Sequence, residues 1–159
     1  GVSGTLTKAI AADAAEGFGE ALFTFPAGYI KPLGCSVYVL GSCPTGLSAT
    51  AGEVGLGTTI ATGAIATLGA GSAAMENLME GTTIANHVAA TPLSIYKANE
   101  PIIAGTHSPT VGSGAVLDAR AGTTKAHINI ASTWNQTAAE NYSFSGYVDI
   151  FWQYLGAGA

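Results

Sequence analysis

The residues that first suggest chemistry are the ten carboxylates, because two acids held together can act as a general acid and a general base. Asp149 stands among aromatic residues, Tyr147, Phe151 and Trp152, where it could serve as a general base or hold a sugar. We favour a simpler interpretation, an acid that faces outward on a strand and pairs with a neighbour or with Lys125. A hydrolase would need a cleft that brings a second acid to Asp149.

The remaining motifs give no support for catalysis. Glu76 and Glu80 lie four residues apart in residues 73–80, which we expect to be helical, and this spacing is typical of a solvated helix face. The sequence contains no GxSxG, HExxH, P-loop or EF-hand pattern. We therefore predict no catalytic residue, no cofactor-binding residue and a protein that is not an enzyme.

Cysteine and histidine are equally uninformative about a metal. Cys35 and Cys43 cannot make a four-ligand zinc site, and no CxxC is present. We favour two reduced cysteines, with a disulfide across the turn at residues 41–44 as the alternative. His87, His107 and His127 have no ligand pattern around them, so we interpret all three as surface histidines and predict no metal site.

The charge composition excludes two classes of partner. Charged residues make up 9% of the chain, against about 25% in an average domain. The net charge is −5, and the five basic residues are scattered singly, so nothing could supply the phosphate contacts that nucleic-acid binding requires. The apolar stretch at residues 58–75 is interrupted by Gly, Ser and Thr, so we predict no membrane span. Sparse charge favours a surface that contacts other proteins.

The elements that would position these residues are short strands. Apolar residues alternate with polar ones in residues 125–131 and 143–155, and residues 35–40 are rich in β-branched and aromatic types. Glycine-rich turns separate these runs. The pattern predicts an all-β fold, an antiparallel β-sandwich or jelly-roll-like domain with at most one or two short helices.

Two regions depart from this strand pattern. Residues 1–20 are rich in Gly, Ala and Thr without a steady period, and we interpret them as an N-terminal arm or lead-in that binds neighbouring subunits or simply frays. Residues 21–159 then form a single β-sandwich domain. We further expect extended segments at residues 48–57, 58–68, 92–97 and 102–104.

Three segments resemble a family of small bacteriophage virion proteins that are encoded beside the major capsid protein. They are residues 53–68, which begin Glu-Val-Gly-Leu-Gly-Thr, residues 127–134, which read His-Ile-Asn-Ile-Ala-Ser-Thr-Trp, and residues 144–156, which begin Phe-Ser-Gly. The resemblance covers about a third of the chain. It implies a virion structural role and a β-sandwich that assembles as an oligomer, and it carries no catalytic residues.

The favoured hypothesis is a capsid decoration, or cement, protein that binds the outer surface of the major capsid protein shell and stabilises it. Its partners would be the major capsid protein and further copies of itself, as a dimer or trimer, with no nucleic acid and no membrane. It would be made in the host bacterial cytoplasm and end on the outer capsid surface of the virion. Two alternatives remain, another virion part such as a head-fibre base or tail component, and a carbohydrate-binding module that uses Tyr147 and Phe151.

Overall fold

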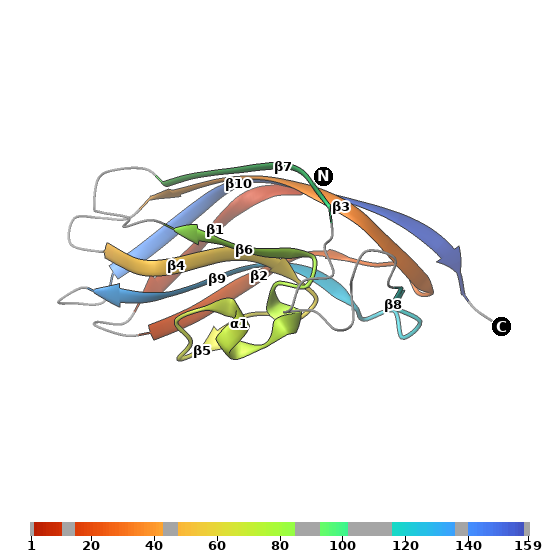
Figure 1. Cartoon of the computed structure of the whole chain (residues 1–159), viewed down its shortest axis with the longest axis horizontal. Helices are drawn as coiled ribbons and strands as arrows, with labels where there is room; N and C mark the ends of the chain where they lie inside the picture. Colours follow the sequence, from red (N-terminus) through yellow and green to blue (C-terminus); the bar gives the residue numbers. More distant parts are fainter. Residues whose placement is uncertain are drawn as a thin grey trace.

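The chain folds as an antiparallel β-sandwich of two five-stranded sheets (Figure 1). The computed structural model describes residues 2–10, 15–42, 48–84, 93–101, 116–135 and 140–157. Sheet A contains, in spatial order, β1 (Val2–Ile10), β10 (Glu140–Gly156), β3 (Tyr29–Ser42) and β7 (Leu93–Pro101), with β8 (Leu117–Asp118) paired to one end of β3. Sheet B contains β5 (Thr62–Gly63), β2 (Ala15–Thr24), β9 (Lys125–Asn135), β4 (Ser48–Gly57) and β6 (Met79–Ile84).

The order of the long strands is that of a jelly roll. From β1 to β4 the chain crosses between the sheets at every step, and β1 and β10, which stand at opposite ends of the described chain, pair along nine residues from Val2↔Val148 to Ile10↔Glu140. Of the long strands, only β4 and β6 follow one another within a single sheet. This arrangement confirms the predicted fold class.

The core lies between the sheets because inward-facing apolar residues alternate with outward-facing ones along each strand. At one end, Phe18, Trp134, Tyr142 and Phe144 pack with ring centroids 4.1 to 6.2 Å apart. At the other, Phe23, Phe25 and Trp152 form a second cluster with centroids 5.3 to 6.1 Å apart. Aromatic clusters of this kind supply much of the apolar area that a sandwich buries.

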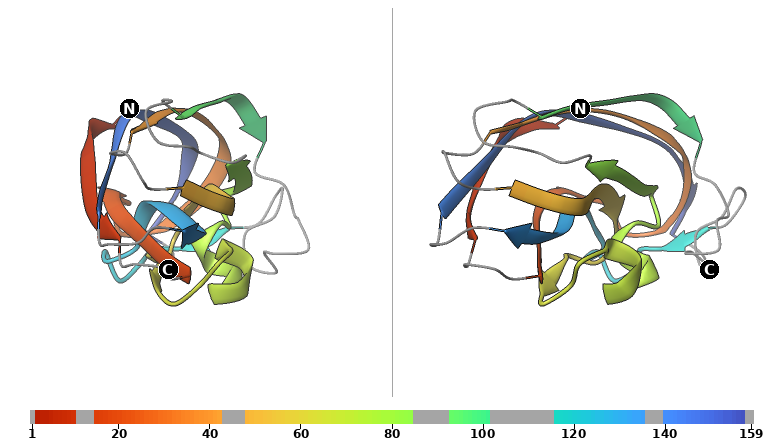
Figure 2. Two further views of the ribbon diagram at one scale, coloured as in Figure 1. Left: turned by 90° about the vertical axis from the view of Figure 1, so that its left-hand side faces the viewer. Right: turned by 60° about the vertical axis from the view of Figure 1, so that its left-hand side comes forward.

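A third layer covers the outer side of sheet B. We call residues 58–78 the cover; it contains β5, the short helix α1 (Leu68–Gly71) and the 3₁₀ turn η1 (Ala73–Met75). Figure 2 shows sheet A arching over one side of sheet B while the cover occupies the other. Leu68 and Met75 of the cover pack with Ala131 of β9 as a small second core. The Thr67 side chain caps α1 by accepting from Ala70 N at 3.4 Å.

The structure differs from the sequence predictions in two regions. The described parts of residues 1–20, which we expected to form an arm, belong to the sheets: β1 and most of β2 lie there, and both strands are paired along their length. The backbone needs no strong side-chain period to join a ladder. Residues 73–80 do not form the predicted helix, since only η1 is helical and β6 already begins at Met79. Residues 58–68 hold only the two-residue β5, and residues 102–104 lie outside the described residues.

Candidate functional site

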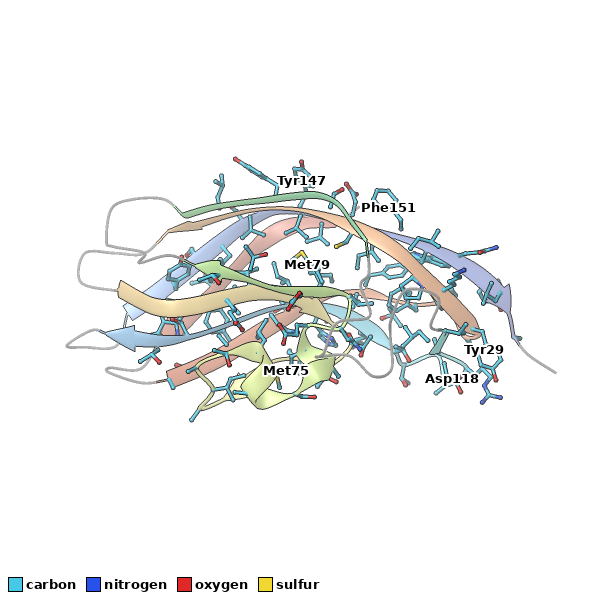
Figure 3. The ribbon with its side chains drawn as sticks, viewed as in Figure 1. Tyr29, Met75, Met79, Asp118, Tyr147 and Phe151 are labelled. Atoms are coloured by element: carbon cyan, nitrogen blue, oxygen red, sulfur yellow. The ribbon has the colours of Figure 1, made fainter. Side chains whose placement is uncertain are left out.

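The most distinctive surface is the outer side of sheet A, where aromatic side chains stand away from the core. Tyr147 of β10 and Tyr38 of β3 are direct cross-strand partners, and their rings stack with centroids 5.6 Å apart at an interplanar angle of 25°. Phe151 follows on the same side of β10 and is 48% exposed, while Tyr147 is 43% exposed. Figure 3 shows Tyr147 and Phe151 along the outer side of the arched sheet. We call Tyr38, Tyr147 and Phe151 the aromatic face.

Strand alternation explains why these side chains share one side. Val148 of β10 and Val37 and Val39 of β3 point into the core, so the residues between them point outward. Gly146 lies directly opposite Val39, and a Cβ there would collide with the carbonyl oxygen of Tyr38. β10 and β3 can therefore approach each other closely at the stacked pair only because residue 146 is glycine.

Two polar residues lie beside the aromatic face on β3 and β10. Ser36 of β3 is the cross-strand partner of Asp149, which follows Tyr147 by two residues on β10. Asp149 thus lies outward between two exposed rings, as the sequence predicts. Lys125 cannot be its partner across the sheet, because Lys125 belongs to β9 of sheet B. Trp152, which follows Phe151 in the sequence, packs against the core, as the alternation of residues 143–155 predicts.

Charge is distributed unevenly between the sheets. The four long strands of sheet A contain equal numbers of basic and acidic residues, Lys8, Lys31, Lys97, Glu100, Glu140 and Asp149. The strands of sheet B contain one basic residue against four acidic ones, Lys125 against Glu16, Glu20, Glu53 and Glu80. The four long strands of sheet A, which carries the aromatic face, are therefore neutral as a group, and the acidity of the chain is concentrated toward sheet B.

A second group of buried polar side chains attaches the cover to sheet B. Asn129 of β9 is fully buried and makes three hydrogen bonds to the cover: its Oδ1 accepts from Ala61 N at 2.8 Å, and its Nδ2 donates to the carbonyls of Thr59 at 2.9 Å and Met75 at 2.6 Å. Within the cover, the buried Asn77 accepts from Thr58 N at 2.9 Å and so joins the two ends of this segment. The sequence interpretation missed both residues, although Asn129 faces outward in a clear alternation.

Two carboxylates belong to the same attachment. Glu53 of β4 accepts from Leu68 N at 2.9 Å, and the buried Glu76 accepts from Gly81 N at 2.8 Å. Each acid thereby satisfies a backbone N–H that the short helix or the β6 edge would otherwise leave unpaired. We therefore assign Glu53 and Glu76 a structural role, the attachment of the cover to sheet B. The expectation that Glu76 lies solvated on a helix is wrong, because Glu76 is buried in the connection to β6, whereas Glu80 is exposed.

Four glycines on the outer side of sheet B allow the cover to pack closely against the strands. A Cβ on Gly57 would collide with the backbone of Ala74 and Met75, and a Cβ on Gly19 would collide with Asn129 Oδ1. Gly17 and Gly55 similarly face cover side chains, Ile65 and Leu68. The pairs 17/19 and 55/57 therefore mark the close approach of a third layer to sheet B.

His127 corrects the prediction of a surface histidine. It does alternate outward on β9, on the same side as Asn129, but it is only 8% exposed. Burial lowers the pKa of His127, Lys125 acts in the same direction, and a hydrogen bond with the Gly57 backbone and the charge of Glu20 oppose them. His87 and His107 lie outside the described residues, as does Cys43. Cys35 is buried, and its thiol donates to the Leu78 carbonyl at 3.9 Å.

An exposed ionic corner lies where β3 meets β8 (Figure 3). Arg120 donates to both carboxylate oxygens of Asp118 at 2.9 and 2.7 Å, and its guanidinium stacks over Tyr29 at 4.8 Å from the ring centroid. These hydrogen bonds hold the pKa of Asp118 at about 2. The arrangement braces the turn after β8, since Arg120 N also donates to Asp118.

Two further features are absent from the part of the chain that the structure describes, a metal site and a membrane-spanning helix. No three His, Cys, Asp or Glu side chains gather there as a metal site would need. None of the described helices has the length and apolar character of a membrane span.

Comparisons with known proteins give only distant likenesses. No protein-family model matches the chain, and no curated protein matches it either. Among solved structures, the N-terminal cellulose-binding domain of Cellulomonas fimi β-1,4-glucanase C aligns with a TM-score of 0.42 and 12% identity, over 92% of this chain and 78% of that one. A CBM4 structure aligns with a TM-score of 0.37 and 10% identity, over 94% of this chain and 83% of that one.

Proposed function

We propose that the chain is a non-enzymatic structural subunit of a bacteriophage particle, which binds the outer surface of the major capsid protein shell and stabilises it. The observation that carries the proposal is the aromatic face, an exposed row of rings on the neutral sheet of an otherwise acidic sandwich. Exposed aromatic residues with few charges around them are typical of surfaces that other proteins bury.

The chemistry of the aromatic face suits a flat protein partner. Tyr38 and Tyr147 stack on each other, so each presents its hydroxyl and ring edge outward instead of two open ring faces. Ser36 and Asp149 supply hydrogen-bonding groups beside them. The acidic sheet B and its cover would remain toward solvent, where charge keeps the particle soluble.

Support for a virion comes from the resemblance of residues 53–68, 127–134 and 144–156 to small phage virion proteins. The first two of these segments contain the glycines and Asn129 that hold the cover, and the third forms most of β10. In this proposal the subunit assembles as a homo-oligomer, dimer or trimer, on the capsid surface. The jelly roll itself does not favour one function, because capsid and lectin domains share it.

Binding to particles stripped of the subunit tests the proposal. Wild-type protein should saturate such particles at a copy number that matches the symmetry of the shell, measured by sedimentation and gel densitometry. The double variant Tyr147→Ser, Phe151→Ser should bind at least about tenfold more weakly, because exposed aromatic anchors carry most of the affinity of such surfaces.

The matched control removes a hydrophobic side chain of similar exposure from the opposite side of the molecule. Ile60 lies in the cover and is 41% exposed, so Ile60→Ser should bind particles as the wild type does. Wild-type protein that fails to bind stripped particles, or a double variant that binds them normally, would refute the proposal.

A carbohydrate-binding module is the second candidate, favoured by the position of Asp149 between Tyr147 and Phe151 on one exposed side. An acid flanked by rings can hold sugar hydroxyls while a ring packs against the sugar face. This function predicts that soluble β-glucans or mannans retard the protein in affinity electrophoresis and that Asp149→Asn abolishes the retardation. Retardation by a polysaccharide together with absent particle binding would select this candidate over the first.

A further inference from the structure

His127 is a buried titratable group that the proposed function does not use. It lies on β9 opposite Gly57 of β4, and among the described residues its Nδ1 has no hydrogen-bond partner. The Gly57 backbone also interacts with the ring as a hydrogen-bond partner. A neutral imidazole can occupy this position with Nδ1 as an unpaired acceptor. Burying an unpaired acceptor costs less free energy than burying a positively charged ring.

The cover is attached immediately beside this ring. Thr58 N and Thr59 N, which follow Gly57, donate to the Ala74 carbonyl at 2.9 and 3.0 Å. The backbone of Ala74 and Met75 lies so close over Gly57 that no Cβ fits there. Two residues along β9 from His127, on the same side, Asn129 holds the cover at both of its ends.

Few charged groups face this position. Lys125 lies on the same side of β9 and would repel a charged ring, while Glu20 of β2 would attract it from the exposed rim. Residues 54–57 of β4 contain no titratable side chain. Within the cover the only titratable residue is Glu76, whose Oε2 is engaged by Gly81 N.

We propose that His127 is an acid-sensitive latch, which holds the cover on sheet B when the ring is neutral and releases it when the ring is protonated. Protonation places a new N–H donor at Nδ1, where the described residues offer no acceptor, and puts a positive charge opposite Gly57, the residue that directly precedes the cover. Release of residues 58–78 relieves both costs while the two-sheet core stays folded. This inference is independent of the partner that the aromatic face binds.

Hydrogen exchange of individual amides tests the latch, with protection factors corrected for the intrinsic effect of pH. Between about pH 7.5 and about pH 5, the amides of Thr58, Thr59, Ala61 and Leu68 should lose protection several-fold. Amides in the central pairing of β3 with β10 should keep theirs. In His127→Gln, a neutral polar ring replacement, the amides of the cover should be equally protected at both pH values.

An unchanged cover in the wild type, or an equal loss in His127→Gln, would overturn the inference. A second measurement needs no variant, namely an NMR titration of the His127 ring in the wild-type protein. The latch requires a midpoint below that of an unfolded histidine, which is about 6.5, and changes in the cover amides at the same pH. A midpoint at or above that of the unfolded residue, or cover amides that change at a different pH, would contradict it.

Discussion

At Asn129 one amide side chain satisfies three backbone groups that lie 54 to 70 residues earlier in the chain, at Thr59, Ala61 and Met75. The bonds with Ala61 N and with the Met75 carbonyl are buried, so water has little access to replace them. The amide is suited to this role because it donates and accepts in one plane.

We expect Asn129→Ala to destabilise the protein by about 2 to 4 kcal/mol, since each buried group left unpaired costs about 1 to 3 kcal/mol and the segment can partly relax. Urea unfolding followed by tryptophan fluorescence measures the change. Asn141→Ala, at an exposed position of β10, serves as the control and should change stability very little. Equal effects of the two substitutions would show that the cover contributes nothing to global stability.

Gly57 provides a steric prediction at the same attachment. Gly57→Ala should cost about 2 kcal/mol or more, because the added methyl group must displace the backbone of Ala74 and Met75. Gly63→Ala is the comparison, since no atom lies within 4 Å of its added methyl group and only its positive φ of 86° opposes the change. We expect about 1 kcal/mol there. A smaller loss at Gly57 than at Gly63 would mean that the cover is not packed tightly.

The sequence predicts toward which side of a strand a side chain points, but it does not predict whether that side is buried. The alternation in residues 125–131 correctly placed His127 and Asn129 on the side opposite Ala126, Ile128 and Ile130. It could not show that this side is covered, because the cover comes from a segment far away in the sequence. The i, i+2 glycine pairs were the available signal, since successive glycines on one side of a strand allow close approach.

At the scale of elements, the strands with strong alternation were predicted and those without it were not. β9 and β10 contain long apolar-polar alternations, and both exist within a few residues of the predicted bounds. β1 and β2 are rich in Gly, Ala and Thr, so their sequence shows no period, yet pairing with β10 and β9 holds them. Such a strand is stabilised by backbone hydrogen bonds to the neighbouring strand. Its own sequence therefore does not reveal that it is a strand.

Removing residues 1–10 tests whether β1 belongs to the sandwich. Deletion leaves one edge of β10 unpaired, so the truncated chain should unfold at lower urea concentration and associate through the exposed edge. Size-exclusion chromatography and urea unfolding measure both effects. A truncated chain that stays monodisperse and equally stable but binds particles poorly would instead revive the interpretation of these residues as a binding arm.

At the scale of the whole molecule, the division between a neutral sheet A and an acidic sheet B predicts how binding responds to salt. Ion pairs between exposed charges weaken as ionic strength rises, whereas aromatic contacts do not. Affinity for stripped particles should therefore change less than about threefold between about 0.05 and about 0.5 M NaCl. Sedimentation at several salt concentrations measures this. A steep loss of binding with salt would place the contact on charged groups, away from the aromatic face.

The most direct test of the central claim is hydroxyl-radical footprinting of the subunit free in solution and bound to the particle. Tyr147 and Phe151 are exposed and readily oxidised in the free chain, and Ile60 reports on the opposite side. The proposed arrangement predicts that binding protects Tyr147 and Phe151 while Ile60 stays as reactive as before. Protection of Ile60 with unchanged oxidation of Tyr147 and Phe151 would contradict it and place the contact on the cover.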